Sequence, residues 1–86
     1  MRTAYIVVCL STKERFKYIF TCTTDLTDLD RFPTFSAAKL VQNIQYRHKN
    51  CAIEFPDKIP SEKLRKRFRP LTIYEQQIIN LMLEFK

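Results

Sequence analysis

The segment "TAYIVVCLS", residues 3–11, decides the fold, because it is apolar on both of its alternating faces. One face holds Ala4, Ile6, Val8 and Leu10, and the other holds Tyr5, Val7 and Cys9. Its shortness and its β-branched residues favour a strand over a helix. A strand that is apolar on both faces is typically internal to its sheet, so we expect this one to have neighbours on both edges.

The next segment, "FKYIFTCTT" at residues 16–24, also alternates. Its apolar face holds Phe16, Tyr18, Phe20 and Cys22. The polar residues 12–15, "TKER", separate the two segments. We therefore predict an antiparallel hairpin closed by a loop of about four or five residues.

Residues 34–50 have the spacing of an amphipathic helix. Its apolar stripe consists of Ala37, Leu40, Val41, Ile44 and His48. Thr34 or Ser36 is suited to cap the start of this helix. The segment "CAIEF", residues 51–55, alternates again and predicts a third strand, which Pro56 ends.

Two helices are expected in residues 61–86. Ser61 is suited to cap a short helix that Leu64 and Phe68 anchor and that Pro70 stops. The second helix, residues 72–85, opens with a capping box, in which Glu75 follows Thr72 by three residues.

The order β-β-α-β-α-α predicts an α+β fold with a three-stranded, mainly antiparallel sheet packed by helices. The 86 residues suit a single domain, 1–86. Within it we expect a ββαβ core over residues 3–55, followed by the basic helix and the C-terminal helix over residues 61–86.

The positive charge of the chain is concentrated ahead of the C-terminal helix. Residues 61–70 hold five Lys or Arg residues against Glu62 alone, so they contribute +4 of the net charge of +6. A local cluster of cations attracts acidic macromolecules by neutralising their charge. The candidate partner-binding residues are Lys63, Arg65, Lys66, Arg67, Phe68 and Arg69. An ordinary solvated helix face is the alternative interpretation.

The C-terminal helix is apolar over a wide surface, because six of the eight residues 78–85 are Ile, Leu, Met or Phe. Packing on the sheet is one use of this surface. The other is a homodimer seam or a partner-binding helix, with Ile79, Met82 and Leu83 as the candidate residues.

A metal site is not expected, although the chain contains the residues of a Cys₃His ligand set. These are Cys9, Cys22, Cys51 and His48. A hairpin with residues 12–15 as its loop would pair Cys9 with Tyr18, and would separate Cys9 from Cys22 by roughly 13 Å along the strands. We therefore expect buried thiols and no cofactor.

Catalytic residues are not expected either, and the chain is predicted not to be an enzyme. It contains no Gly, which excludes the phosphate loop and the dinucleotide-binding fingerprint. Three Cys residues do not form an even disulfide set, and no apolar run approaches the length of a membrane span. These features favour a reduced, cytoplasmic protein without a membrane partner.

Residues 4–55 resemble the small ββαβ accessory proteins of bacteriophages. The resemblance is carried by "AYIVVCLSTKERFKYIFTCT", by "TDLTDLDRFPTFSAAKLV" and by "CAIEF". It implies a compact, virus-encoded protein that binds and modulates a host component in the host cytoplasm.

The sequence thus suggests a small basic binding protein that modulates or inhibits a host macromolecule by surface docking. The acidic partner is a host protein surface in this interpretation. The alternative is a regulatory protein that binds DNA or RNA directly through the basic residues 63–69.

Overall fold

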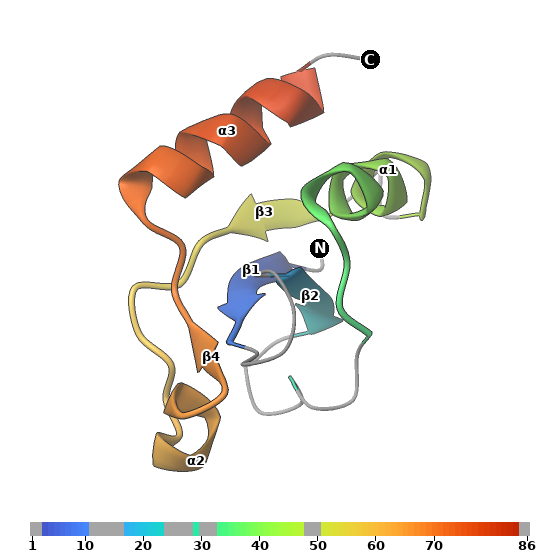
Figure 1. Cartoon of the computed structure of the whole chain (residues 1–86). Coiled ribbons are helices and arrows are strands. Elements are labelled where there is room, and N and C mark those ends of the chain that lie inside the picture. The colour runs from blue at the N-terminus through green and yellow to red at the C-terminus, as the bar shows by residue number, and fades with distance from the viewer. Residues whose placement is uncertain (1–2, 11–16, 24–28, 30–32, 48–50, 85–86) are drawn as a thin grey trace.

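The first strand, β1 (Thr3–Cys9), is the centre of the sheet in the computed structural model of the chain, which describes residues 3–10, 17–23, 29, 33–47 and 51–84. Along one edge β1 pairs antiparallel with β2 (Lys17–Thr23), from Thr3 opposite Thr23 to Cys9 opposite Lys17. The prediction of an internal strand and of an antiparallel hairpin is confirmed (Figure 1).

Two short strands share the other edge of β1. β3 (Ala52–Glu54) pairs parallel to its first residues, and β4 (Phe68–Arg69) pairs antiparallel to Val8 and Cys9. The α+β class is confirmed. The sheet is mixed, because β3 pairs parallel to β1 whereas β2 and β4 pair antiparallel to it, and β4 is an extra strand. β3 and β1 are far apart in the chain, so local sequence patterns predict neither the direction of β3 nor the edge of the sheet that it joins.

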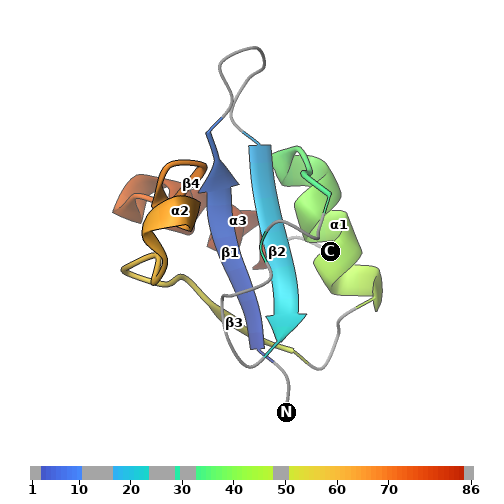
Figure 2. The ribbon, with the colours of Figure 1, turned by 90° about the horizontal axis from the view of Figure 1, so that it is seen from below.

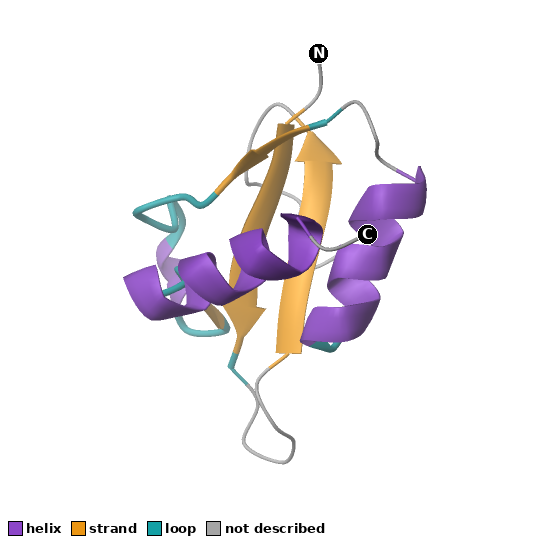
Figure 3. Cartoon of the chain, turned by 90° about the horizontal axis from the view of Figure 1, so that it is seen from above, coloured by secondary structure: helices purple, strands orange, loops and turns teal. Residues whose placement is uncertain are grey.

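The helices cover both faces of the sheet. α1 (Ala37–Arg47) and α3 (Ile73–Glu84) lie over one face, and α2 (Glu62–Arg65) lies over the other (Figures 2 and 3). Gln45 of α1 donates a hydrogen bond of 3.2 Å from Nε2 to the Leu83 carbonyl, which satisfies a carbonyl in the last turn of α3. The element order is therefore β-β-α-β-α-β-α.

The alternation of β1 divides the core into two clusters. The larger cluster lies under α1 and α3, and its fully or nearly fully buried residues are Ala4, Ile6, Val8, Leu40, Val41, Ile44, Leu71 and Ile79. The smaller cluster lies under α2 and consists of Val7, Leu29, Ile59, Leu64 and Phe68. Both faces of β1 are covered by helices, which explains why the strand carries apolar residues on both faces.

The register of the hairpin differs from the predicted one by one residue. Tyr18 lies opposite Val8 rather than Cys9. A shift of one residue exchanges the faces of a strand, and here it places Tyr18 against the larger cluster. Two backbone hydrogen bonds, of 2.8 and 2.7 Å, also join Tyr18 to Phe35 just ahead of α1.

The first residues of α1 confirm one predicted cap. The Ser36 carbonyl accepts the first helical hydrogen bond from Leu40, and its Oγ lies 3.4 Å from the amide nitrogen of Lys39. Leu40, Val41 and Ile44 are buried as the stripe predicts, whereas His48 lies outside the described residues. In the described part of the chain, no helix is both long and apolar enough to cross a membrane.

Candidate macromolecule-binding surface

The helix α2 is fixed to the sheet by two apolar side chains. Leu64 is 5% exposed and Phe68 is 3% exposed, and both belong to the smaller core cluster. The prediction that Leu64 and Phe68 anchor this segment is confirmed. Ser61 is the N-cap residue, as predicted, but its side chain makes no capping hydrogen bond.

The cations around Leu64 point away from the core. Successive residues of an α-helix are rotated by about 100°, so an inward Leu64 leaves Lys63, Arg65 and Lys66 distributed over the outer side. All three are exposed, and no carboxylate among the described residues forms an ion pair with any of them. Together with Arg67, which is also exposed, they are called the α2 cation surface below.

Arg67 is positioned by its neighbours. Its guanidinium carbon lies 5.7 Å from the centroid of the Phe68 ring, which is a cation–π contact. Its backbone carbonyl accepts a hydrogen bond of 2.8 Å from the Leu10 amide, and its own amide donates one of 3.0 Å to the Leu64 carbonyl. These contacts hold the C-terminal end of the α2 cation surface against the end of β1.

The basic helix is shorter than predicted. α2 ends at Arg65 with Lys66 as its C-cap, and Phe68–Arg69 forms β4 instead of continuing the helix to Pro70. Two causes act together. A residue that precedes proline is disfavoured in the helical conformation, and that residue is Arg69. The end of β1 also offers backbone groups at Val8 and Cys9 with which β4 pairs.

This short strand removes two of the six candidate residues from the surface. Phe68 lies opposite Cys9 and points into the smaller core cluster, so it is not an exposed anchor for a partner. Arg69 lies opposite Val8, and since successive strand residues point to opposite faces, it projects toward α3. The predicted cluster of five cations is therefore divided by the sheet.

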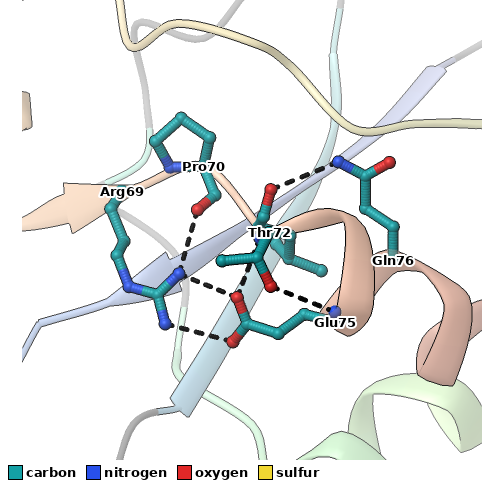
Figure 4. Close-up of polar contacts among 6 residues, drawn as sticks. Arg69, Pro70, Thr72, Glu75 and Gln76 are labelled. Atoms are coloured by element: carbon teal, nitrogen blue, oxygen red, sulfur yellow. Dashed lines mark hydrogen bonds and ion pairs between the residues drawn. The ribbon is translucent and has the colours of Figure 1, made fainter.

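The guanidinium of Arg69 pairs with Glu75 of α3 (Figure 4). Two parallel hydrogen bonds join the groups, Nη1 to Oε1 at 2.8 Å and Nη2 to Oε2 at 3.1 Å, and Nη1 also reaches the Pro70 carbonyl at 3.1 Å. A bidentate pair of this kind is among the stronger ionic contacts in proteins. It ties β4 to the first turn of α3.

Glu75 also closes the predicted capping box, which is confirmed. Its Oε1 accepts a hydrogen bond of 2.9 Å from the Thr72 amide, and the Glu75 amide donates one of 3.2 Å to Thr72 Oγ1. The hydrogen bond from Arg69, above all, holds the pKa of Glu75 at about 2, well below its ordinary value, with further help from Thr72 and against the effect of burial.

Tyr18 lies beside this pair on the same face of the sheet. Burial raises the pKa of Tyr18, the Glu75 carboxylate raises it further, and Arg69 opposes the change. Tyr18, Arg69 and Glu75 thus form a half-buried polar contact that joins β2 and β4 to α3. Sequence reasoning missed this contact, because it depends on the pairing of β4 with β1, which places Arg69 beside α3.

The solvent-facing side of α3 is not the side that carries the candidate residues Ile79, Met82 and Leu83. Ile79 is fully buried, and Met82 and Leu83 are half-buried against the larger core cluster. These three residues therefore do not form an exposed seam. The large apolar side chains that α3 exposes are Ile73 at 75%, Tyr74 at 76%, Ile78 at 44% and Leu81 at 54%.

The described cysteines lie on opposite faces of the sheet. Cys9 packs against the smaller core cluster and Cys51 against the larger one. The side chains of Cys22 and His48 lie outside what the structure describes. Among the described residues there is no group of three or more His, Cys, Asp or Glu that could hold a metal ion.

In the part of the chain that the structure describes, the α2 cation surface and the apolar outer side of α3 thus lie on opposite sides of the sheet. Comparison of the chain with protein-family models, with curated proteins and with solved structures finds no significant match.

Proposed function

We propose that the chain is a non-enzymatic binding protein that docks on an acidic host protein surface through the α2 cation surface and thereby modulates or inhibits that protein. Lys63, Arg65 and Lys66 supply exposed positive charge, and Arg67 adds a fourth cation at the end of the segment. The resemblance of residues 4–55 to phage accessory proteins is consistent with a host target.

One observation carries this proposal: three neighbouring exposed cations have no ion-pair partner in the described part of their own chain. Arg69, by contrast, is neutralised within the chain, because the Glu75 carboxylate accepts two hydrogen bonds from its guanidinium. Like charges held close together repel one another, and an acidic partner removes that repulsion. Leu64 anchors the backbone that carries the cations, so that binding needs little ordering of the backbone.

An acidic protein fits this surface better than nucleic acid does. Proteins that bind single strands add exposed aromatic rings on which bases stack, and the aromatic side chain of this segment, Phe68, is 3% exposed. A recognition helix that enters the major groove presents several side chains to the bases, whereas α2 contains four residues. The α2 cation surface therefore offers charge without an exposed aromatic ring for stacking and on a helix of four residues only.

We expect the double reversal Arg65→Glu with Lys66→Glu to lower capture of the protein partner from host lysate about tenfold or more, since it turns attraction into repulsion at the centre of the surface. The matched control is Lys39→Glu with Arg47→Glu, which makes the same change in net charge at two exposed positions of α1. Each variant is used as bait with and without nuclease, and the captured proteins are quantified by mass spectrometry.

The two halves of this design test different parts of the proposal. Equal loss of capture by both double variants would show that only the net charge matters and would contradict a localised surface. Loss of capture after nuclease treatment would show that the acidic partner is a nucleic acid. The proposal predicts that capture survives nuclease and is lost only in the α2 variant.

A further inference from the structure

We infer that the outer side of α3 is covered by the α3 helix of a second copy of this chain, running antiparallel about a two-fold axis near Gln77 and Ile78. The inference is independent of the proposed function, because it concerns the opposite face of the sheet and stands whether or not the α2 cation surface binds a partner.

The first support is the spacing of the exposed apolar residues. Tyr74, Ile78 and Leu81 follow one another at intervals of four and three residues, which is the spacing of the apolar seam in paired helices. The same residues are 76%, 44% and 54% exposed, while Ile79 on the inner side of the helix is fully buried. α3 therefore carries two apolar faces, and its own sheet covers one of them.

The second support is the distribution of charge. The chain carries a net charge of +6, so two copies repel each other across most orientations. The outer side of α3 has no cation among its described residues, and Glu84 is its one exposed acidic residue. The α2 cation surface lies over the opposite face of the sheet (Figure 3). Contact through α3 keeps the two cationic surfaces apart.

The third support is charge complementarity in the antiparallel arrangement. A helix of 12 residues is about 18 Å long. Alignment about an axis between Gln77 and Ile78 sets Tyr74 opposite Leu81 of the second copy. The same alignment brings the Glu84 carboxylate to the N-terminal turn of the other α3. The positive end of a helix dipole attracts a carboxylate, so both ends of the helix pair are matched.

The N-terminal turn of α3 has amides available for this contact. Thr72 Oγ1 accepts from the amide of Glu75, and the Thr72 amide is engaged by the Glu75 carboxylate. The amides of Ile73 and Tyr74 have no acceptor among the described residues. The parallel arrangement would instead bring the two Glu84 carboxylates together, which is unfavourable.

This interface is small. A single helix pair with three large apolar side chains in the seam of each copy belongs to the low end of the range for protein complexes, below about 1,200 Å² of total buried area. We therefore expect a weak dimer, whose population rises with the protein concentration. Its consequence is a particle with two α2 cation surfaces that face away from each other.

The test is sedimentation equilibrium of the full chain from micromolar to millimolar concentration. We expect the mass to rise from that of a monomer towards twice that value. Ile78→Glu should weaken dimerisation roughly tenfold or more, because it places like charges beside the axis. Tyr46→Glu, at a 72% exposed aromatic on α1, should leave it unchanged.

A second pair of variants keeps the proposal falsifiable if Ile78→Glu fails to fold. Gln77→Cys lies at the axis and should form a disulfide-linked dimer under mild oxidation, whereas Asn80→Cys, exposed on the same helix but away from the axis, should not. Both variants keep the native cysteines, so a difference in cross-linking between them comes from the introduced cysteine. A chain that stays monomeric at millimolar concentration, equal cross-linking of both variants, or a different protein bound on this helix in place of a second copy would overturn the inference.

Discussion

The variant Phe68→Ala is expected to lower the free energy of unfolding by about 3–5 kcal/mol. Phe68 is 3% exposed and belongs to the smaller core cluster together with Val7 and Leu64. Its removal costs the transfer free energy of the ring and leaves a cavity that the rigid sheet cannot close. A domain of this size is stable by only a few kcal/mol, so the loss is a large part of the total.

Urea denaturation followed by far-ultraviolet circular dichroism measures this change. The control is Tyr46→Ala, which removes a 72% exposed aromatic ring and should change stability by less than about 0.5 kcal/mol. A loss below about 1 kcal/mol for Phe68→Ala would mean that Phe68 is not buried in solution, and would restore it as an exposed anchor for a partner.

The second large effect concerns Glu75, whose replacement by Gln should cost about 2–3 kcal/mol at neutral pH. The folded protein holds the pKa of this carboxyl at about 2, against 4.5 as its ordinary value. The charged form is thus favoured by folding. Gln keeps the shape of the side chain and loses the ion pair with Arg69, whose side chain is 31% exposed.

The same pair predicts a pH dependence of stability. Because the folded pKa of Glu75 is lowered, its contribution is fully present above about pH 4.5 and is lost as the pH falls from there towards about 2. In Glu75→Gln this part of the acid sensitivity should be absent, so the stability curves of parent and variant should converge at low pH. The measurement is a series of urea denaturations between pH 7 and pH 2.

The control for this series is Glu54→Gln, which removes an exposed carboxylate on β3. Because this variant keeps the ion pair between Arg69 and Glu75, its stability should still fall as the pH drops from about 4.5 towards 2. If Glu75→Gln also ran parallel to the parent down to pH 2, Glu75 would have an ordinary pKa and the link between β4 and α3 would be weak in solution.

The sequence predicted the elements that depend on local patterns. The alternation of residues 3–11 gives β1, the stripe of Leu40, Val41 and Ile44 gives α1, and Thr72 with Glu75 gives the start of α3. Each of these signals is contained in fewer than a dozen residues, and the periodicities of strand and helix are distinct.

The features that were missed depend on which edge or face a segment meets. β4 forms because the end of β1 is available to Phe68–Arg69, and a two-residue strand has no periodicity of its own. On α3, the sequence offers apolar residues on both sides, so periodicity alone did not show that Ile79 faces the sheet and Ile78 the solvent. The register of the hairpin was missed for the same reason, because both faces of β1 are apolar.

The cations of α2, rather than the net charge, form the contact surface for an acidic macromolecule in the proposed function. Its most direct test is amide chemical-shift mapping by NMR as poly-L-glutamate is added to the ¹⁵N-labelled chain. We expect the shifts to concentrate on the amides of residues 62–67 and to leave those of Lys39 and Arg47 on α1 unchanged. Shifts of similar size at all exposed cations, or at α1 alone, would contradict it.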